Sequence, residues 1–121
     1  MKLRAAVLAI LATSIPASAF PPLSCEGRVN GAFWGLELLG NTAVWHTAEG
    51  RRNAAITSTS DLPGPVKRQL FVLSDEGSIH LAVATETGCL RNDLNFPVRV
   101  NVLSPDDGDH PLRTACCTAA E

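Results

Sequence analysis

The sequence predicts an all-β fold in which about seven or eight short antiparallel strands follow one another as a small meander. We expect the sheet to close, or nearly close, into a barrel that is stapled by disulfides. Apolar and polar residues alternate along short runs, and turn residues separate these runs at intervals of about 8–12 residues, which is typical of barrels and sandwiches. Most connections have hairpin length, which favours a meander over a Greek key. The choice between barrel and sandwich stays open.

The first half of the chain shows the alternation between strong turn signals. Asparagine and glycine stand at 30–31 and again, in reverse order, at 40–41, where they favour tight two-residue turns. In the run between these turns, Trp34, Leu36 and Leu38 share one face, because successive side chains of a strand point to opposite sides. The strands expected here cover 25–29, 32–39, 42–48 and 54–60, with a polar turn at 49–53.

The second half continues the pattern with two runs that flank a turn at 75–77. On the later run, one face carries branched apolar residues and the other carries a histidine and two alanines. A valine-rich run follows, with Val98, Val100 and Val102 inward and Arg99 outward. The remaining expectations are strands at 66–74, 78–86, 98–104 and 112–118, a loop at 88–97 and a turn at 105–111.

The first 19 residues predict a secretory signal peptide. Lys2 and Arg4 make a positive start, an apolar run follows over 5–12, and small residues at 17–19 fit the positions that a signal peptidase recognises. A buried N-terminal helix is the competing interpretation. The apolar run is shorter than the roughly 20 residues that a membrane-spanning helix needs, and no later run is longer. We therefore expect no transmembrane span.

Cleavage after Ala19 would leave a single β domain, residues 20–121, in the periplasm or outside the cell. Without the two basic residues of the leader, this domain has eight basic and twelve acidic side chains, a formal charge of −4. An acidic domain with no basic run has no electrostatic reason to bind nucleic acid. A lipid anchor at Cys25 is not favoured, because Pro22 occupies the position where a lipidation motif has leucine.

Four cysteines predict two disulfides in this setting: Cys25, Cys89, Cys116 and Cys117. A metal site would need ligand spacings such as C-x₂-C, which the sequence lacks. Cys116 and Cys117 are neighbours, so on a strand their thiols point to opposite faces. A bond between them is not favoured, because adjacent Cα atoms lie about 3.8 Å apart and disulfides usually span about 4.4–6.8 Å.

Each of the adjacent cysteines should therefore pair with a distant one. If the turn at 105–111 makes a hairpin, residues near 98 and 99 lie opposite Cys117 and Cys116, and Cys89 begins the loop that leads there. A closed sheet would bring Cys25 on the first strand beside the last strand. We predict Cys89–Cys116 and Cys25–Cys117, and the exchanged pairing stays open.

No motif in the sequence predicts a catalytic residue, a cofactor or a metal site. The histidines, His46, His80 and His110, have no second ligand at a recognised spacing, and on strands we expect them to face solvent or to be capped by a hydrogen bond. The run DDGDH at 106–110 lacks the ligand pattern of an EF-hand loop and predicts a turn. Trp34 and Trp45 are interpreted as packing residues rather than as a ligand platform.

Two short motifs resemble a family of small, uncharacterised exported bacterial proteins, of the type described as predicted membrane proteins or putative lipoproteins. The first combines Cys-x-Gly at 25–27 with Phe-Trp-x-Leu at 33–36. The second is a cysteine loop that starts at Cys89, leads to Phe-Pro at 96–97 and closes on the cysteines at 116–117. The resemblance implies a β-rich exported domain and brings no activity with it.

These observations predict a non-enzymatic exported domain that binds an unidentified protein or a component of the bacterial envelope. One alternative is a protein similar to the periplasmic inhibitors of c-type lysozyme, which share the size and class but carry a Ser-Gly-Ser loop that is absent here. A second alternative is a redox protein or another enzyme. It is not favoured, because the sequence has no C-x-x-C motif and no nucleophile motif.

Overall fold

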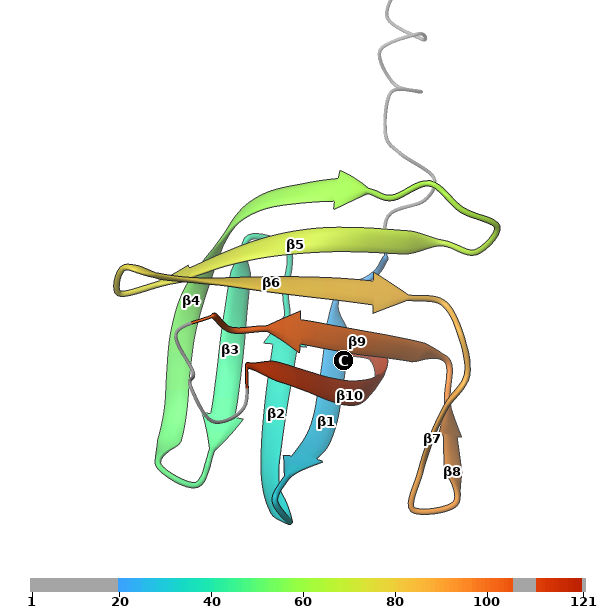
Figure 1. Cartoon of the computed structure of the whole chain (residues 1–121), viewed down its shortest axis with the longest axis horizontal. Coiled ribbons are helices and arrows are strands. Elements are labelled where there is room, and N and C mark those ends of the chain that lie inside the picture. The colour runs from blue at the N-terminus through green and yellow to red at the C-terminus, as the bar shows by residue number, and fades with distance from the viewer. Residues whose placement is uncertain (1–19, 106–110, 121) are drawn as a thin grey trace, which may run out of the picture.

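The computed structural model describes residues 20–105 and 111–120, and in this part of the chain every regular element is a β-strand (Figure 1). Eight strands close into an antiparallel barrel in the order β1-β10-β9-β6-β5-β4-β3-β2, and β7 pairs with β8 as a separate hairpin. The strands are β1 Leu23–Val29, β2 Ala32–Leu38, β3 Thr42–Thr47, β4 Gly50–Asp61, β5 Arg68–Asp75, β6 Ser78–Thr85, β7 Cys89–Arg91, β8 Leu94–Phe96, β9 Val98–Leu103 and β10 Leu112–Ala119.

The closed antiparallel barrel confirms the predicted fold class. Every barrel strand pairs with its neighbours in the sequence, except that β9 follows β6 across the β7–β8 hairpin and β10 returns to β1. The contact between first and last strands closes the sheet and removes its two edges.

Strand β4 forms a corner that shapes the barrel. Its first part pairs with β3 from Gly50 to Ala55, and its second part pairs with β5 from Ala55 to Asp61, with a register shift between Ile56 and Ser58. Such an irregularity bends a strand so that it can belong to two sheets. In Figure 1, β5, β6 and β9 accordingly run nearly at right angles to β1, β2 and β3. The predicted turn at 49–53 is wrong beyond Glu49, where β4 begins.

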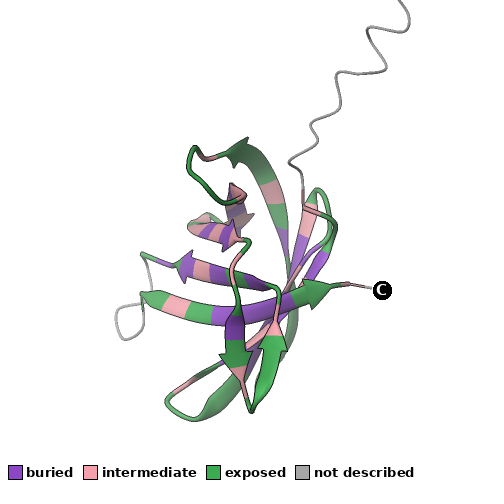
Figure 2. Cartoon of the chain, turned by 90° about the vertical axis from the view of Figure 1, so that its right-hand side faces the viewer, coloured by how far each residue is buried: buried purple, intermediate pink, exposed green. Residues whose placement is uncertain are grey.

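The segment predicted as a loop at 88–97 is instead the β7–β8 hairpin, which projects from the barrel (Figure 2). Its two-residue turn places Asn92 at φ 52° and Asp93 at φ 64°. Both residue types tolerate this left-handed backbone, which a tight turn of this kind requires. The sequence signal was weak because each strand has only three residues.

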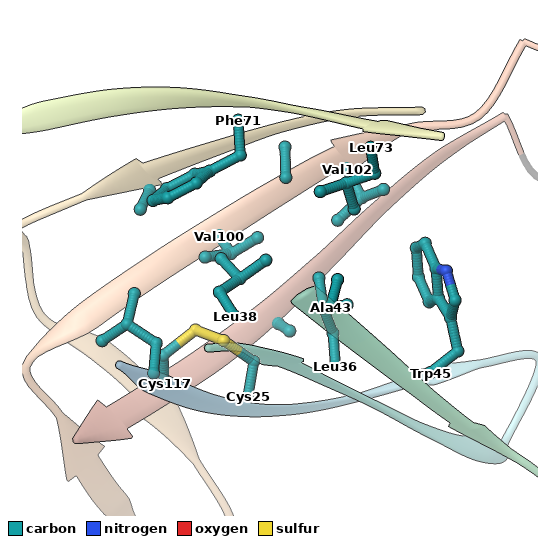
Figure 3. Packing of buried hydrophobic residues seen from close by; sticks show 14 of the residues in the cluster. Cys25, Leu36, Leu38, Ala43, Trp45, Phe71, Leu73, Val100, Val102 and Cys117 are labelled. Carbon is teal, nitrogen blue, oxygen red and sulfur yellow. A yellow bond between two sulfur atoms is a disulfide. The ribbon is translucent and has the colours of Figure 1, made fainter. Parts of the chain in front are cut away.

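The interior of the barrel is filled by alternate residues of its eight strands (Figure 3). Strand β6 turns its small residues inward: Ala82 and Ala84 are completely buried, whereas Ile79 is 47 % exposed on the outer face. Large side chains of other strands, such as Leu36, Leu73 and Phe71, occupy the space beside these alanines. A narrow barrel needs such alternation of large and small residues to close without overlap.

The disulfides are Cys25–Cys117 and Cys89–Cys116, which confirms the predicted pairing. Cys117 is opposite Cys25 in the register of β1 and β10, and both sulfur atoms lie in the core (Figure 3). Cys116 points to the other face of β10, where it holds the hairpin through Cys89. The predicted register is confirmed too, because Cys117 lies opposite Val98 and Cys116 opposite Arg99.

No helix in the described residues is long and apolar enough to cross a membrane. The disulfides are compatible with an oxidising compartment outside the cytoplasm. The segment predicted as a signal peptide, residues 1–19, lies outside the part of the chain that the structure describes, so the predicted cleavage after Ala19 stays a prediction.

Candidate binding site at the mouth of the barrel

The two ends of the barrel have different interiors. At one end, strands turn into one another at 39–41 and 62–67, and apolar side chains fill the lumen. At the other end, the connections at 30–31, 48–49 and 76–77 follow the strands β1, β3 and β5. Here the inward positions next to the core become polar: Asp75 on β5, His80 on β6, Arg113 on β10, and Ser104 directly after β9.

A cavity of about 450 Å³ opens among these polar residues, and we call it the mouth. Its volume lies within the range of about 300–1,000 Å³ that is usual for small-molecule sites, which are often found in the mouths of β-barrels. Trp45 forms part of its wall, so the mouth combines an aromatic surface with charged groups. The residues that line it are Trp45, Thr47, Glu49, Gly50, Arg51, Arg52, His80, Ser104 and Arg113.

His80 is fixed on two sides. Its ring meets the Trp45 ring edge-on, with 5.2 Å between ring centroids. Its Nδ1 lies 2.7 Å from the Ser104 Oγ, and Ser104 is itself buried. The sequence predicted a histidine that either faces solvent or is capped by a hydrogen bond. The hydrogen bond with Ser104 shows that His80 is capped. A packed and hydrogen-bonded ring is held in one orientation toward the mouth.

Trp34 and Trp45 pack against each other in the core, with ring centroids 6.2 Å apart, which confirms their predicted packing role. Arg113 lies over the Trp34 ring, with 5.7 Å from its Cζ to the ring centroid. Cations are attracted to the face of an indole at such distances. Gly27 makes room for Trp34, because a Cβ at that position would lie 2.9 Å from the indole Nε1 and 2.6 Å from the Thr114 carbonyl oxygen.

Arg52, which lines the mouth, is paired with a buried carboxylate that lies outside the lining. Asp75 is 4 % exposed, and Arg52 donates a hydrogen bond to its Oδ2. This pair joins β4 to the end of β5, where the two strands no longer pair along their backbones. Glu49, which lines the mouth, accepts a hydrogen bond from the Thr47 hydroxyl at 3.1 Å. Among the described residues, Glu49 in the lining and Asp75 beside Arg52 therefore both have a donor.

Trp45 provides an unused donor. Its indole Nε1 is buried and has no acceptor within the described residues. Figure 3 shows this nitrogen on the side of the ring that faces away from Val100, Leu38 and the Cys25–Cys117 disulfide. A buried N–H without a partner is uncommon in native proteins and calls for an explanation, such as a ligand or water.

The other candidates from the sequence do not join the mouth. His46 is on the outer face of β3, partly exposed, with its Nε2 3.0 Å from the Glu37 Oε1. His110 and the rest of the DDGDH run at 106–110 lie outside the described residues. All four cysteines are bound in disulfides. In the described part of the chain, no three or more His, Cys, Asp or Glu side chains gather as metal ligands.

Sequence reasoning missed the mouth because His80, Ser104 and Arg113 lie far along the chain from the stretch 45–52, which supplies the other lining residues, and no recognised motif joins them. One signal was present: the face of 78–86 with His80, Ala82 and Ala84 is an unusual composition for an exposed strand face. Comparison with family models, with curated proteins and with solved structures found no match. The geometry of the mouth is thus the basis for inferring a function.

Proposed function

We propose that this chain is an exported, non-enzymatic binding domain that takes a small molecule into the mouth of its barrel. The observation that carries the proposal concerns Trp45: the residue lines an open cavity, and its indole N–H is buried with no acceptor in the described residues. The rest of the barrel is closely packed around it, so the site would be formed before a ligand arrives. Pre-formed sites bind without a large ordering cost.

The chain is well suited to a direct test, because it has two tryptophans and no tyrosine. Each tryptophan gives one indole N–H signal in a nitrogen-resolved NMR spectrum. Because both rings lie at or beside the mouth, both signals report on this region. We expect members of a library of small neutral, anionic and cationic compounds to shift the Trp45 signal. A library that shifts neither indole signal at millimolar concentration would contradict the proposal.

Two neighbouring residues on β3 provide a matched pair of variants for this test. Thr47 lines the mouth, whereas His46 points to the outer face. Thr47→Phe should fill the opening and abolish the shifts, and His46→Phe should leave them unchanged. Equal binding by both variants would place the ligand elsewhere.

The β7–β8 hairpin favours a second candidate function, a periplasmic inhibitor of a cell-wall hydrolase. Such an inhibitor needs a rigid exposed segment that enters the cleft of the enzyme. The hairpin is tied to the barrel by Cys89–Cys116, and Arg91 forms an ion pair with Glu26 on β1. It exposes two large apolar side chains, Leu90 at 72 % and Leu94 at 63 %. Exposed apolar residues on a rigid support are common in protein contacts.

A lysozyme assay separates this candidate from the first. The inhibitor function predicts slower hydrolysis of cell walls by c-type lysozyme at micromolar protein. It further predicts that Leu90→Ser together with Leu94→Ser relieves the inhibition, whereas Thr47→Phe at the mouth does not. Hydrolysis at an unchanged rate would exclude inhibition of this enzyme class.

A further inference from the structure

Phe20, the residue that follows the predicted leader, is held against the filled end of the barrel by its backbone and by its ring. Its backbone N–H donates a hydrogen bond to the Gln69 Oε1, with 3.2 Å between nitrogen and oxygen. Its ring packs against the core cluster, and the Lys67 Nζ lies 4.8 Å from the ring centroid. These contacts fix the position of the Phe20 nitrogen relative to the barrel.

The acceptor of this hydrogen bond is itself oriented by a carboxylate. Gln69 is 5 % exposed, and its Nε2 donates a hydrogen bond to the Asp61 Oδ1 at 2.8 Å. Gln69 and Asp61 lie opposite each other in the register of β5 and β4, so the sheet holds them together. A hydrogen bond from the amide to a carboxylate polarises the amide, which makes its oxygen a stronger acceptor. The pair therefore favours a positively charged donor at the Phe20 nitrogen.

Two cations are close in the sequence, and neither takes this place. Lys67 contacts the Phe20 ring and is paired with Glu86, whose Oε2 lies 3.9 Å from the Lys67 Nζ. Arg68 precedes Gln69 on β5, so its side chain points to the opposite face of the strand. There its guanidinium donates to the Pro63 carbonyl oxygen at 2.6 Å. The acceptor oxygen of Gln69 is thus left to the backbone of Phe20.

The predicted cleavage after Ala19 changes the chemistry of the Phe20 nitrogen. In the uncleaved chain this nitrogen is a neutral amide N–H, and after cleavage it is an α-ammonium group that is charged at neutral pH. Charged donors form shorter and stronger hydrogen bonds than neutral ones. We infer that Gln69 and Asp61 form a binding site for the α-ammonium group of the processed chain, so that removal of the leader stabilises the filled end. This inference rests on the predicted cleavage and is independent of the ligand proposed for the mouth.

Two forms of the chain without its leader test the inference. One begins at Phe20, and the other keeps Ala19, which moves the ammonium group by one residue and leaves an amide N–H at Phe20. Both contain every barrel strand, because the strands lie between Leu23 and Ala119. Each form is released from a fusion protein by a protease that leaves no additional residue. In urea denaturation at neutral pH, we expect the form that begins at Phe20 to have an unfolding constant about tenfold smaller.

Two substitutions of aspartate separate the charge from other effects of the additional residue. Asp61→Asn keeps an oxygen that can accept from Gln69 and removes the charge, so the difference between the two forms should fall below about threefold. Asp93→Asn is the matched control, because Asp93 is exposed in the turn of the β7–β8 hairpin. It removes one negative charge elsewhere and should leave the difference between the two forms unchanged.

Three results would overturn the inference. The first is an equal unfolding constant for the two forms of the unaltered sequence. The second is a difference that persists in full in Asp61→Asn, because the effect would then not depend on the carboxylate. The third is an intact mass of the protein, exported from the full-length chain by a bacterial host, that places its first residue at a position other than Phe20.

Discussion

Buried polar side chains at both ends of the barrel are hydrogen-bonded, among them Asp75 and Ser104 at the mouth, but the two ends differ in one donor. At the filled end, Gln69 is buried, and both halves of its amide are used: Oε1 accepts from the Phe20 backbone N–H at 3.2 Å, and Nε2 donates to Asp61 at 2.8 Å. At the mouth, the buried Trp45 N–H has no acceptor in the described residues. The Gln69 amide at the filled end is fully hydrogen-bonded, whereas the Trp45 N–H at the mouth is not. The difference separates a part that stabilises from a part that is available to bind.

The largest expected effect comes from removing the disulfide in the core of the filled end. Cys25→Ala with Cys117→Ala deletes a link across 92 residues of sequence separation. We expect the free energy of unfolding to fall by about 4–5 kcal/mol in urea denaturation, because a long closed loop restricts the unfolded chain most. The comparison is Cys89→Ala with Cys116→Ala, which removes a disulfide with a shorter sequence separation of 27. Its loss should be smaller, and an equal or larger loss would contradict the argument.

A single truncation tests the packing of the filled end. Leu38 is 2 % exposed in the core, and its chain neighbour Leu39 is 39 % exposed. Leu38→Ala should cost about 2–5 kcal/mol of unfolding free energy, because the closed barrel cannot collapse into the cavity that is left. Leu39→Ala should cost less than about 0.5 kcal/mol. Similar midpoints for the two variants in thermal denaturation would show that the end is loosely packed.

Gly27 connects stability to the shape of the mouth region. Gly27→Ala pushes a methyl group toward the Thr114 carbonyl oxygen and the Trp34 indole, so we expect a loss of about 1–3 kcal/mol. The Trp34 indole NMR signal should shift as the ring moves. Gly35→Ala on the neighbouring strand β2 is the comparison, since the nearest atom to its Cβ, the Cys25 carbonyl oxygen, would lie 3.3 Å away and the expected loss is smaller. The prediction fails if the two alanine variants unfold at the same urea concentration and Trp34 keeps its signal.

The smallest effect should come from the rim. Arg52→Gln leaves the buried Asp75 carboxylate with a weaker, neutral donor, and we expect a loss of about 1–2 kcal/mol. Arg52 is itself 66 % exposed, so solvent screens part of the interaction. The difference in unfolding free energy between the unaltered protein and the variant should therefore be smaller in high salt. A difference that does not depend on salt would assign the effect to packing of the arginine stem.

The alternation of residues was sufficient to predict the barrel strands, and with the turn signals it placed Val98 opposite Cys117. From there the pairing of the cysteines followed, because adjacent residues on a strand must reach different faces. Alternation alone could not decide which face of β6 is inside. Ile79, Leu81 and Val83 are the more apolar set, yet the barrel takes Ala82 and Ala84, because the available space is small.

The mouth could not be predicted by the same reasoning. Trp45, His80, Ser104 and Arg113 come together only after closure brings β10 to β1 and the β4 corner turns β5 and β6 across the other strands. Their proximity depends on the register of four strands at once, and an error of one residue in any of them would turn a side chain outward. A single sequence does not fix those registers with that precision.

The adjacent cysteines also give the molecule a particular covalent connectivity. Cys25–Cys117 closes a large ring of backbone, and Cys89–Cys116 closes a smaller ring inside it, so that the two rings share one stretch of chain. Any single cut in the backbone between Cys25 and Cys117 leaves all parts joined. Trypsin cannot separate Cys116 from Cys117, because no lysine or arginine stands between them. A complete digest without reduction therefore holds three peptides together as one species, and reduction releases all three.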